Sequence, residues 1–220
     1  MRTIQIKQIE QNIPMDSPFF YNLIIENSRL LRDFLFDLSE ECSFFNYIGE
    51  QKTTFHDDAY FVENPLYASL DSKKADSLLQ KEISSRITYD QKEEYESLMN
   101  LVYDYINSIS YDYPIPVTFN DDLPLQTLLK TMGLTPELTE VTDINKLIQN
   151  IKVLSYLLKK DIFVFFNLKD FFSEDEILIF LKSMTQLEVK ILIISSHSSP
   201  KLQDERQIII DKDLCELHIC

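Results

Sequence analysis

The hydrophobic positions of this chain gather into short, nearly uninterrupted runs toward both ends of the sequence. Residues 19–26, 161–166 and 189–195 are such runs. Strands that are buried on both faces have this pattern, which is typical of parallel sheets covered by helices. Further strands are expected at 1–7, 59–63, 207–210 and 213–219, and a polar-edged hairpin is expected over 43–56 around Gly49.

Apolar residues spaced three and four apart predict helices among these strands. The expected helices cover residues 28–39, 71–86, 88–109, 122–132, 143–159 and 174–185, with Thr142 and Ser173 as N-caps of the last two. Strands and helices alternate at both ends of the chain, whereas four helices follow one another in the middle. This order predicts an α/β fold with a mostly parallel sheet. Residues 1–70 and 160–220 are expected to form a discontinuous head domain, and residues 71–159 an inserted α-helical lobe.

Glycine is scarce, since the chain has two glycines, Gly49 and Gly133, among its 220 residues. A phosphate-binding Walker A loop needs two glycines, the second followed by lysine and then serine or threonine. Here Glu50 follows Gly49 and Leu134 follows Gly133, and a dinucleotide fingerprint would need a third glycine. The sequence therefore argues against nucleotide chemistry that depends on a glycine-rich loop.

The chain is strongly acidic, with a formal net charge of −15 at pH 7. This charge argues against a uniformly basic nucleic-acid binder, so any contact with nucleic acid must use a local basic surface. The apolar runs are shorter than the roughly eighteen residues that cross a bilayer, and the N-terminal residues lack the apolar core of a signal peptide. These features predict a cytoplasmic protein without membrane contact.

Three stretches of the sequence resemble, in content and order, the small ring-forming adaptation protein of type II-A CRISPR systems. They cover residues 60–74, 128–134 and 151–176. The resemblance implies an α/β head related to P-loop NTPases but without Walker motifs, and a helical leg. It implies a homotetrameric ring, stabilised by calcium ions, that takes the ends of linear double-stranded DNA through a positively lined hole without sequence preference. It also implies no catalytic activity, and action with the integrase complex and the effector nuclease in spacer acquisition.

Residues 144–169 carry five lysines against one acid, although the chain as a whole is acidic. On a helical wheel one side of this segment is an apolar stripe, formed by Leu147, Ile151, Leu154 and Leu158. The opposite side carries the candidate DNA-binding residues Lys146, Lys152, Lys159 and Lys160. Such lysines would bind phosphates of any DNA sequence, because phosphate contacts position a protein and base contacts specify. The alternative is the solvated charged face that any amphipathic helix presents.

Acidic residues concentrate between residues 88 and 143, where eleven acids accompany two lysines. Asn120, Asp121 and Asp122 form the best local cluster for a calcium ion, just before a predicted helix, where the resembled family keeps calcium-binding acids. The family usually has another carboxylate within that helix, but Thr127 occupies the position in this chain. Asp121 and Asp122 are therefore the candidate ligands of a structural calcium ion, with N-capping of the helix as the alternative.

Two other functions stay open from the sequence. The acidic surplus is typical of a protein-binding scaffold that recruits other members of an adaptation complex. A degenerate nucleotide-binding enzyme would use Asn167, which follows a buried strand as a Walker B acid does, but an amide replaces an ionised carboxylate poorly at a magnesium site. His197 follows another buried strand, and the sequence reveals neither an acid partner nor an oxyanion hole for it. We therefore expect a protein that is not an enzyme.

Overall fold

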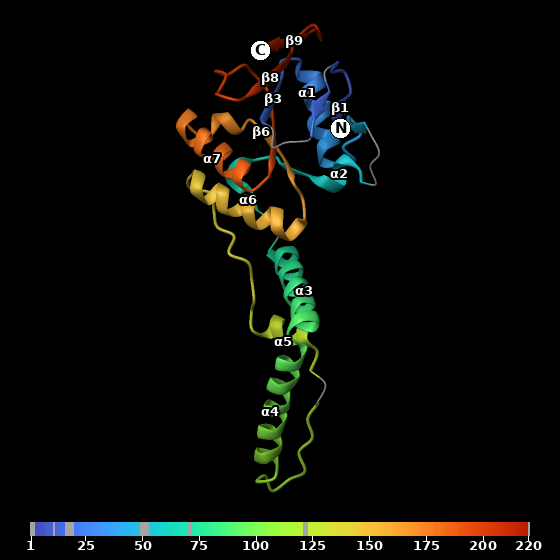
Figure 1. Cartoon of the computed structure of the whole chain (residues 1–220), viewed down its shortest axis with the longest axis vertical. Coiled ribbons are helices and arrows are strands. Elements are labelled where there is room, and N and C mark those ends of the chain that lie inside the picture. The colour runs from blue at the N-terminus through green and yellow to red at the C-terminus, as the bar shows by residue number, and fades with distance from the viewer. Residues whose placement is uncertain are drawn as a thin grey trace. The chain divides into compact units, whose positions relative to one another are not determined.

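The computed structural model describes residues 3–10, 12–15, 20–48, 53–69, 72–120 and 123–219. Its contacts divide the chain into two compact units, and Figure 1 labels the helices and several of the strands. Met1–Ser69 with Glu137–Cys220 form one unit, which we name the head, and Leu70–Pro136 form the other, which we name the lobe. By its contacts the helix at 144–158 belongs to the head. The predicted limits, 1–70 with 160–220 and 71–159, assign it to the lobe, and they stay a prediction.

The head is built on a six-stranded sheet in which five neighbouring strands run parallel. From edge to edge the order is β5 (Ala59–Val62), β6 (Ile162–Phe166), β7 (Lys190–Ser195), β3 (Phe20–Ile25), β8 (Arg206–Ile210) and β9 (Glu216–Ile219). Strand β9 pairs antiparallel with β8. The long apolar runs of the sequence form β3, β6 and β7, each of which pairs with a strand on both sides. The predicted α/β fold with a mostly parallel sheet is therefore confirmed.

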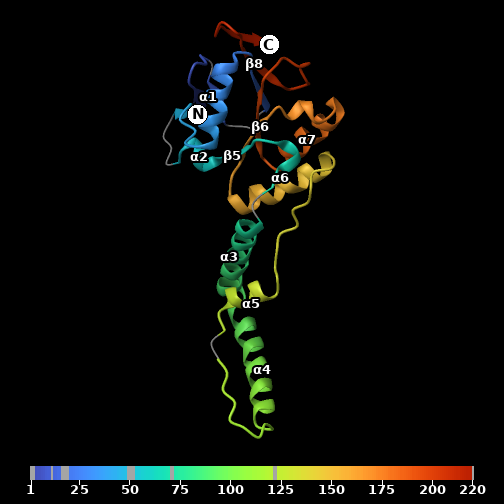
Figure 2. The same cartoon turned by 180° about the vertical axis from the view of Figure 1, so that it is seen from behind.

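Helices cover both faces of this sheet. The head helices are α1 (Ser28–Ser39), α2 (Phe55–Asp58), α6 (Ile144–Leu158) and α7 (Glu174–Gln186). On one face, Val164 of β6 belongs to the core cluster that contains Phe34 of α1. The next residue, Phe165, points to the other face, where its ring lies edge-on to Phe180 of α7 with centroids 5.6 Å apart. Figures 1 and 2 show α1 and α7 on opposite sides of the strands.

A small antiparallel sheet lies on the α1 side of the head core. Its order is β2 (Ile13–Pro14), β1 (Thr3–Ile6) and β4 (Phe45–Ile48). The predicted hairpin over 43–56 is wrong, because β4 pairs with β1 and helix α2 follows instead of a second strand. A capping box explains the helix: the Asp57 amide donates to the Thr54 side chain, and the Asp57 carboxylate accepts from the Thr54 amide. Gly49 itself lies outside the described residues.

Asn150 of α6 joins two segments of the head, close to where the chain departs for the lobe and where it returns. Its side chain is fully buried. The Nδ2 atom donates to the carbonyl oxygens of Ala68, at 3.1 Å, and Thr139, at 2.7 Å. The Oδ1 atom accepts from the Thr139 amide at 3.2 Å. One buried amide therefore satisfies three backbone groups, each of which would be costly to leave unpaired.

The lobe is helical. It contains α3 (Ser72–Asp90), α4 (Lys92–Ser110) and α5 (Leu125–Thr131). Just after α5, Gly133 has a φ of +66°, the left-handed conformation that glycine favours beyond a helix end, as the sequence predicts. Helix α4 carries a stripe of large apolar side chains that are 40–68% exposed: Leu98, Leu101, Val102, Tyr105 and Ile109. Across the residues that could be described, no helix has the length and apolar character needed to cross a membrane.

Candidate nucleic-acid interface

Helix α6 begins at a charged N-cap. Asp143 caps it in place of the predicted Thr142, because its Oδ1 atom accepts from the amides of Asn145, at 2.9 Å, and Lys146, at 3.2 Å. The Thr142 hydroxyl donates to the Asp143 carboxylate at 3.1 Å. The backbone hydrogen bond from Lys146 is the largest cause that lowers the pKa of Asp143. The cap is therefore ionised at neutral pH, where it complements the positive end of the helix dipole.

One face of α6 packs into the head, and the other faces solvent. The buried side chains are Ile144, Leu147, Asn150, Ile151, Leu154 and Leu157. Three members of the predicted stripe are among them, whereas the fourth, Leu158, is half-buried. Residues 144–158 include two lysines and no acid. The exposed side of α6 is therefore basic in a chain that is acidic overall.

Three of the four candidate lysines belong to this side. Lys152 is exposed and Lys146 is half-buried. Lys159 ends the helix in the left-handed conformation, with φ 57°, and its Nζ atom lies 4.2 Å from the ring centroid of Tyr156. The Tyr156 side chain is 55% exposed, so it adds an aromatic surface beside the Lys159 ammonium. We name Lys146, Lys152, Tyr156 and Lys159 the α6 basic surface. Their contact with DNA stays a prediction.

Lys160, the fourth candidate, lies beyond the helix end and turns toward β5. Its ammonium group donates to the carbonyl oxygens of His56, in the last turn of α2, and Ala59, the first residue of β5. A cation at this position complements the negative end of α2. Lys160 thus has a structural role in the head, and we leave it out of the α6 basic surface, although its proposed contact with DNA is not tested.

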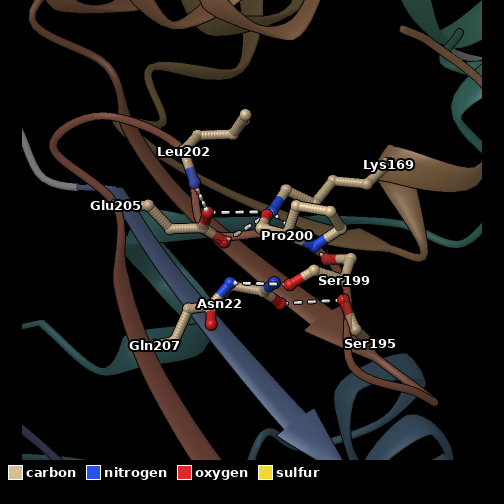
Figure 3. A network of polar contacts seen from close by, with 8 residues as sticks. All are labelled: Asn22, Lys169, Ser195, Ser199, Pro200, Leu202, Glu205 and Gln207. Atoms are coloured by element: carbon tan, nitrogen blue, oxygen red, sulfur yellow. Dashed lines mark hydrogen bonds and ion pairs between the residues drawn. The ribbon is translucent and has the colours of Figure 1, made fainter. Parts of the chain in front are cut away.

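Lys169, the remaining lysine of the basic segment, is buried in an ion pair (Figure 3). Its Nζ atom lies 2.9 and 2.8 Å from the two carboxylate oxygens of Glu205. It also donates to the Ser199 hydroxyl at 3.2 Å and to the Pro200 carbonyl at 2.8 Å. The side chains of Lys169 and Glu205 are 9% and 0% exposed. The pair fixes the connection from β7 to β8, so we do not count Lys169 toward a DNA-binding surface.

Polar residues also lie within the central strands, beside this ion pair (Figure 3). The Ser195 hydroxyl donates to Asn22 Oδ1 at 2.7 Å, and both residues are buried. Gln207 Nε2 donates to the Ser199 carbonyl at 3.3 Å. Gln207 thus binds the β7–β8 connection to the sheet, whereas Ser195 and Asn22 link β7 to β3. The sequence offers little signal for Asn22, because it is a single polar residue within an apolar run.

The carboxyl ends of β6 and β7 are joined by a polar cluster, of which the sequence singles out Asn167 and His197 but not their partners. The Oδ1 atom of Asn167 accepts from the Ser196 amide at 2.9 Å, and its Nδ2 atom donates to the Ser196 hydroxyl at 3.1 Å. Ser196 Oγ lies 3.0 Å from His197 Nδ1, and His197 Nε2 lies 3.1 Å from Asp170 Oδ1. Asp170 is thus the acid partner of His197 that could not be recognised from the sequence.

The contacts of Ser196 favour a structural role for this cluster over a nucleophilic one. An acyl-transfer site needs backbone amides that are aimed at a developing oxyanion. The amide of Ser196 is instead bound to Asn167, and the Ser196 hydroxyl accepts a second bond from the same side chain. Asn167 is therefore engaged in linking the carboxyl ends of β6 and β7.

In a Walker A motif, the turn between a strand and the following helix wraps the phosphates. In this chain β3 ends at Ile25 and α1 begins at Ser28, so that Glu26 and Asn27 alone connect them. The Asn27 side chain accepts from the Leu30 amide at 3.0 Å and caps the helix. A connection this short cannot wrap backbone amides around a phosphate. The structure thus agrees with the absence of a glycine-rich loop.

The predicted calcium ligands, Asp121 and Asp122, lie outside the described residues. Within the rest of the chain, as far as the structure describes it, no three His, Cys, Asp or Glu side chains form a group that could hold a metal ion. Thr127, which replaces the expected acid, lies in the first turn of α5, where its amide donates to the Pro124 carbonyl at 2.9 Å. Calcium binding stays a prediction.

These features define a class: an α/β protein without a phosphate loop, with a helical insertion and a lysine-bearing helix as its candidate interface. The family model described as CRISPR-associated protein (Cas_Csn2) matches residues 36–214. Because the match spans most of the chain, the protein belongs to this family, that of the type II-A CRISPR adaptation protein. The family is one of non-enzymatic adaptation proteins. The resemblance found in the sequence is confirmed.

Proposed function

We propose that this chain is a non-catalytic, cytoplasmic adaptation protein that binds the ends of linear double-stranded DNA as a homotetrameric ring. It would act without sequence preference, together with the integrase complex and the effector nuclease, when new spacers are acquired. The proposal extends the membership of the chain in the Cas_Csn2 family. The observation that carries it is the α6 basic surface, on a helix without acids, in a chain of net charge −15.

The chemistry of this surface suits phosphate rather than bases. A lysine ammonium group binds phosphate as a point charge, and such contacts carry no sequence information. One protomer supplies few of these contacts, whereas a ring multiplies them and restrains the DNA topologically. We therefore expect an affinity that falls steeply with salt, because each phosphate contact releases counterions.

Substitution of the two helical lysines tests this surface. In the variant Lys146→Glu with Lys152→Glu, we expect the affinity for a linear duplex to fall at least about tenfold, and the slope of log affinity against log salt to become shallower by roughly one for each lysine that contacts phosphate. Lys182→Glu, on the exposed side of α7, is the matched control. Wild-type affinity in the double variant would remove α6 as the contact surface.

DNA topology tests the ring separately from the lysines. A ring that threads over ends should bind a linear duplex but not the same sequence as a closed circle, and cutting the circle should restore binding. A gel-shift experiment with the two forms measures this difference. Equal affinity for both forms would contradict threading.

Self-association is supported by the exposed apolar stripe of α4, because contiguous apolar surface commonly marks an interface. We expect Leu101→Ser with Tyr105→Ser to convert the tetramer into smaller species, as measured by light scattering after size-exclusion chromatography. Tyr89→Ser, at an 85% exposed position of α3, is the control that should leave the mass unchanged. A tetramer that persists in the double variant would exclude this role for α4.

Calcium is proposed as a structural ion of the ring, with Asp121 and Asp122 among its ligands. Bound calcium would supply a positive charge that carboxylates from one or more segments can share. We expect chelation to lower the mass of the assembly, and Asp121→Asn with Asp122→Asn to make the mass insensitive to calcium. An unchanged tetramer after chelation would contradict the proposal.

The proposed kinship of the head to P-loop NTPases is supported by its parallel sheet, and it requires that the phosphate loop was lost.

A further inference from the structure

Phe36 of α1 is 69% exposed, and it stands between two open grooves of the head surface. Arg32 and Phe36 line both grooves, which have volumes of about 400 and 410 Å³. A large aromatic side chain between two hollows leaves apolar area in water, which is unfavourable unless something covers it. We name the two grooves with Phe36 between them the α1 double groove.

The first groove lies between α1 and the carboxyl ends of β5 and β6. Its lining is largely apolar and includes Leu31, Leu35, Phe61 and Phe166. These four side chains are partly buried and pack against the head core, so the groove has a firm floor. Glu63 also lines it. The groove therefore suits a large apolar side chain.

The second groove lies on the other side of Phe36, along α1 and the turn after it. Phe36 and Phe44 supply its apolar surface, while Asp33, Glu40 and Glu41 supply exposed carboxylates. An apolar surface bordered by carboxylates favours a ligand that combines an apolar group with positive charge.

The other charged side chains at this groove reduce its negative charge only in part. Asp37 also lines it, but its carboxylate accepts hydrogen bonds from the amides of Ser43 and Phe44 and so belongs to the turn. Lys7 holds its Nζ atom 5.5 Å from the Phe44 ring centroid, and the Nε atom of Arg32 lies 4.0 Å from Asp33 Oδ1 in an exposed ion pair. Together the linings of the two grooves hold one arginine and five carboxylates, so the α1 double groove is acidic.

We propose that the α1 double groove docks a segment of a partner protein that carries large apolar side chains flanked by lysine or arginine. The apolar side chains would enter the two hollows beside Phe36, and the cations would meet Asp33, Glu40 and Glu41. Duplex DNA does not suit this surface, because the carboxylates repel phosphates. A two-fold contact with a second copy of the chain does not suit it either, because such a contact would bring two acidic grooves together. This surface is distinct in charge from the α6 basic surface, so the inference goes beyond DNA binding.

A synthetic peptide tests the chemistry. The probe is a fluorescent peptide of about twelve residues made of arginine and leucine, and fluorescence anisotropy measures its affinity for the full chain. Two matched peptides carry serine in place of every leucine, or glutamine in place of every arginine. We expect the arginine–leucine peptide to bind at least about tenfold tighter than either matched peptide. If the serine peptide binds equally well, attraction to an acidic chain explains the binding and the proposal fails.

Substitutions then locate the site. Phe36→Ser, and separately Glu40→Lys with Glu41→Lys, should each weaken binding of the arginine–leucine peptide about tenfold. Ile179→Ser and Asp175→Lys change exposed positions of α7 and should leave the affinity unchanged. All of these positions are exposed, so helical circular dichroism should be retained. A control that lowers the affinity as much as Phe36→Ser overturns the proposal.

Two further measurements on Phe36→Ser separate the possible occupants. Its affinity for linear duplex DNA should equal that of the wild type. This expectation holds whether or not Lys146→Glu with Lys152→Glu weakens DNA binding. Its assembly mass should also be unchanged. A lower mass would assign the α1 double groove to a second copy of the chain, and a lower DNA affinity would assign it to DNA. Either result overturns the proposal.

Discussion

The ammonium group of Lys169 lies within hydrogen-bond distance of both carboxylate oxygens of Glu205, 36 residues further along the chain, at 2.9 and 2.8 Å. The Glu205 side chain has no exposed surface. Removal of the lysine would leave an uncompensated buried charge, which costs roughly 3–5 kcal/mol. We expect Lys169→Met to lower the free energy of unfolding by about 3 kcal/mol, as measured by urea denaturation.

Two comparisons make this prediction specific to the ion pair. Lys182→Met, at an exposed position of α7, should change the free energy of unfolding by less than about 0.5 kcal/mol. Lys169→Met combined with Glu205→Leu should recover part of the loss, because no buried charge then remains. A single variant as stable as the Lys182 control would show that the pair contributes little.

The buried amide of Asn150 gives a second stability prediction. Asn150→Ala removes the partner of three backbone groups, at Ala68 and Thr139, within the head. We expect a loss of about 2 kcal/mol in the free energy of unfolding, because buried backbone groups become unpaired. Gln149→Ala, one residue earlier and exposed, is the control. Equal stability of the two variants would contradict the assigned role.

The helix caps predict how stability depends on pH. Hydrogen bonds at helix N-termini lower the pKa values of Asp57, Asp143 and Glu176, and for Glu176 the largest cause is the bond from the Ser173 amide. A lowered folded-state pKa means that the unfolded chain binds protons first as the pH falls. This stabilisation is complete above the unfolded-state pKa values, about 4 for these carboxyl groups, and is lost as the pH falls through the lower folded-state values.

Glu176→Gln tests the pH prediction, because glutamine does not titrate. We expect its urea midpoint to lie below the wild-type midpoint at pH 7 and to fall less steeply in acid. Glu174→Gln, in the same helical turn but outside the capping box, serves for comparison. If the urea midpoint of Glu176→Gln falls with pH as steeply as that of the wild type, Glu176 does not contribute to the pH dependence of stability.

The cysteines give a prediction that does not depend on stability. Burial, with a smaller contribution from the charge of Asp37, raises the pKa of Cys42 to about 11, whereas Cys215 is exposed. Thiolate is the reactive form, so in a Cys220→Ser background one thiol should react quickly with a chromogenic disulfide reagent. The second should react only when urea unfolds the chain. Two fast thiols in the folded protein would disprove this assignment.

Features of this fold that leave a local signal could be predicted from the sequence. The run at 161–166 becomes β6, Ile162–Phe166, because a strand covered on both faces must be apolar along its whole length. The capping box of Ser173 and Glu176 marks the start of α7, because both partners lie within four residues. Gly133 marks the end of α5 for a similarly local reason, because glycine favours the left-handed conformation that follows a helix.

Long-range partners could not be predicted. A helical wheel treats a helix as isolated, so it could not reveal that Lys160 would bind the carbonyl of His56, 104 residues earlier. That contact exists because β5 and β6 pair side by side. The wheel also fails beyond Lys159, where the left-handed backbone ends the helical geometry. The pair of His197 with Asp170 likewise depends on the adjacency of β6 and β7.

The double contact of Asn150 has a topological consequence. The carbonyls of Ala68 and Thr139 accept from the same nitrogen, so the segment that leads out of the head lies beside the segment that leads back into it. With respect to the head, residues 69–138 therefore form one long insertion whose two ends are held together by Asn150. Closure entropy grows slowly with loop length. A longer, shorter or different insertion would leave the Asn150 hydrogen bonds and the strand order unaltered, so its length can evolve independently of the sheet.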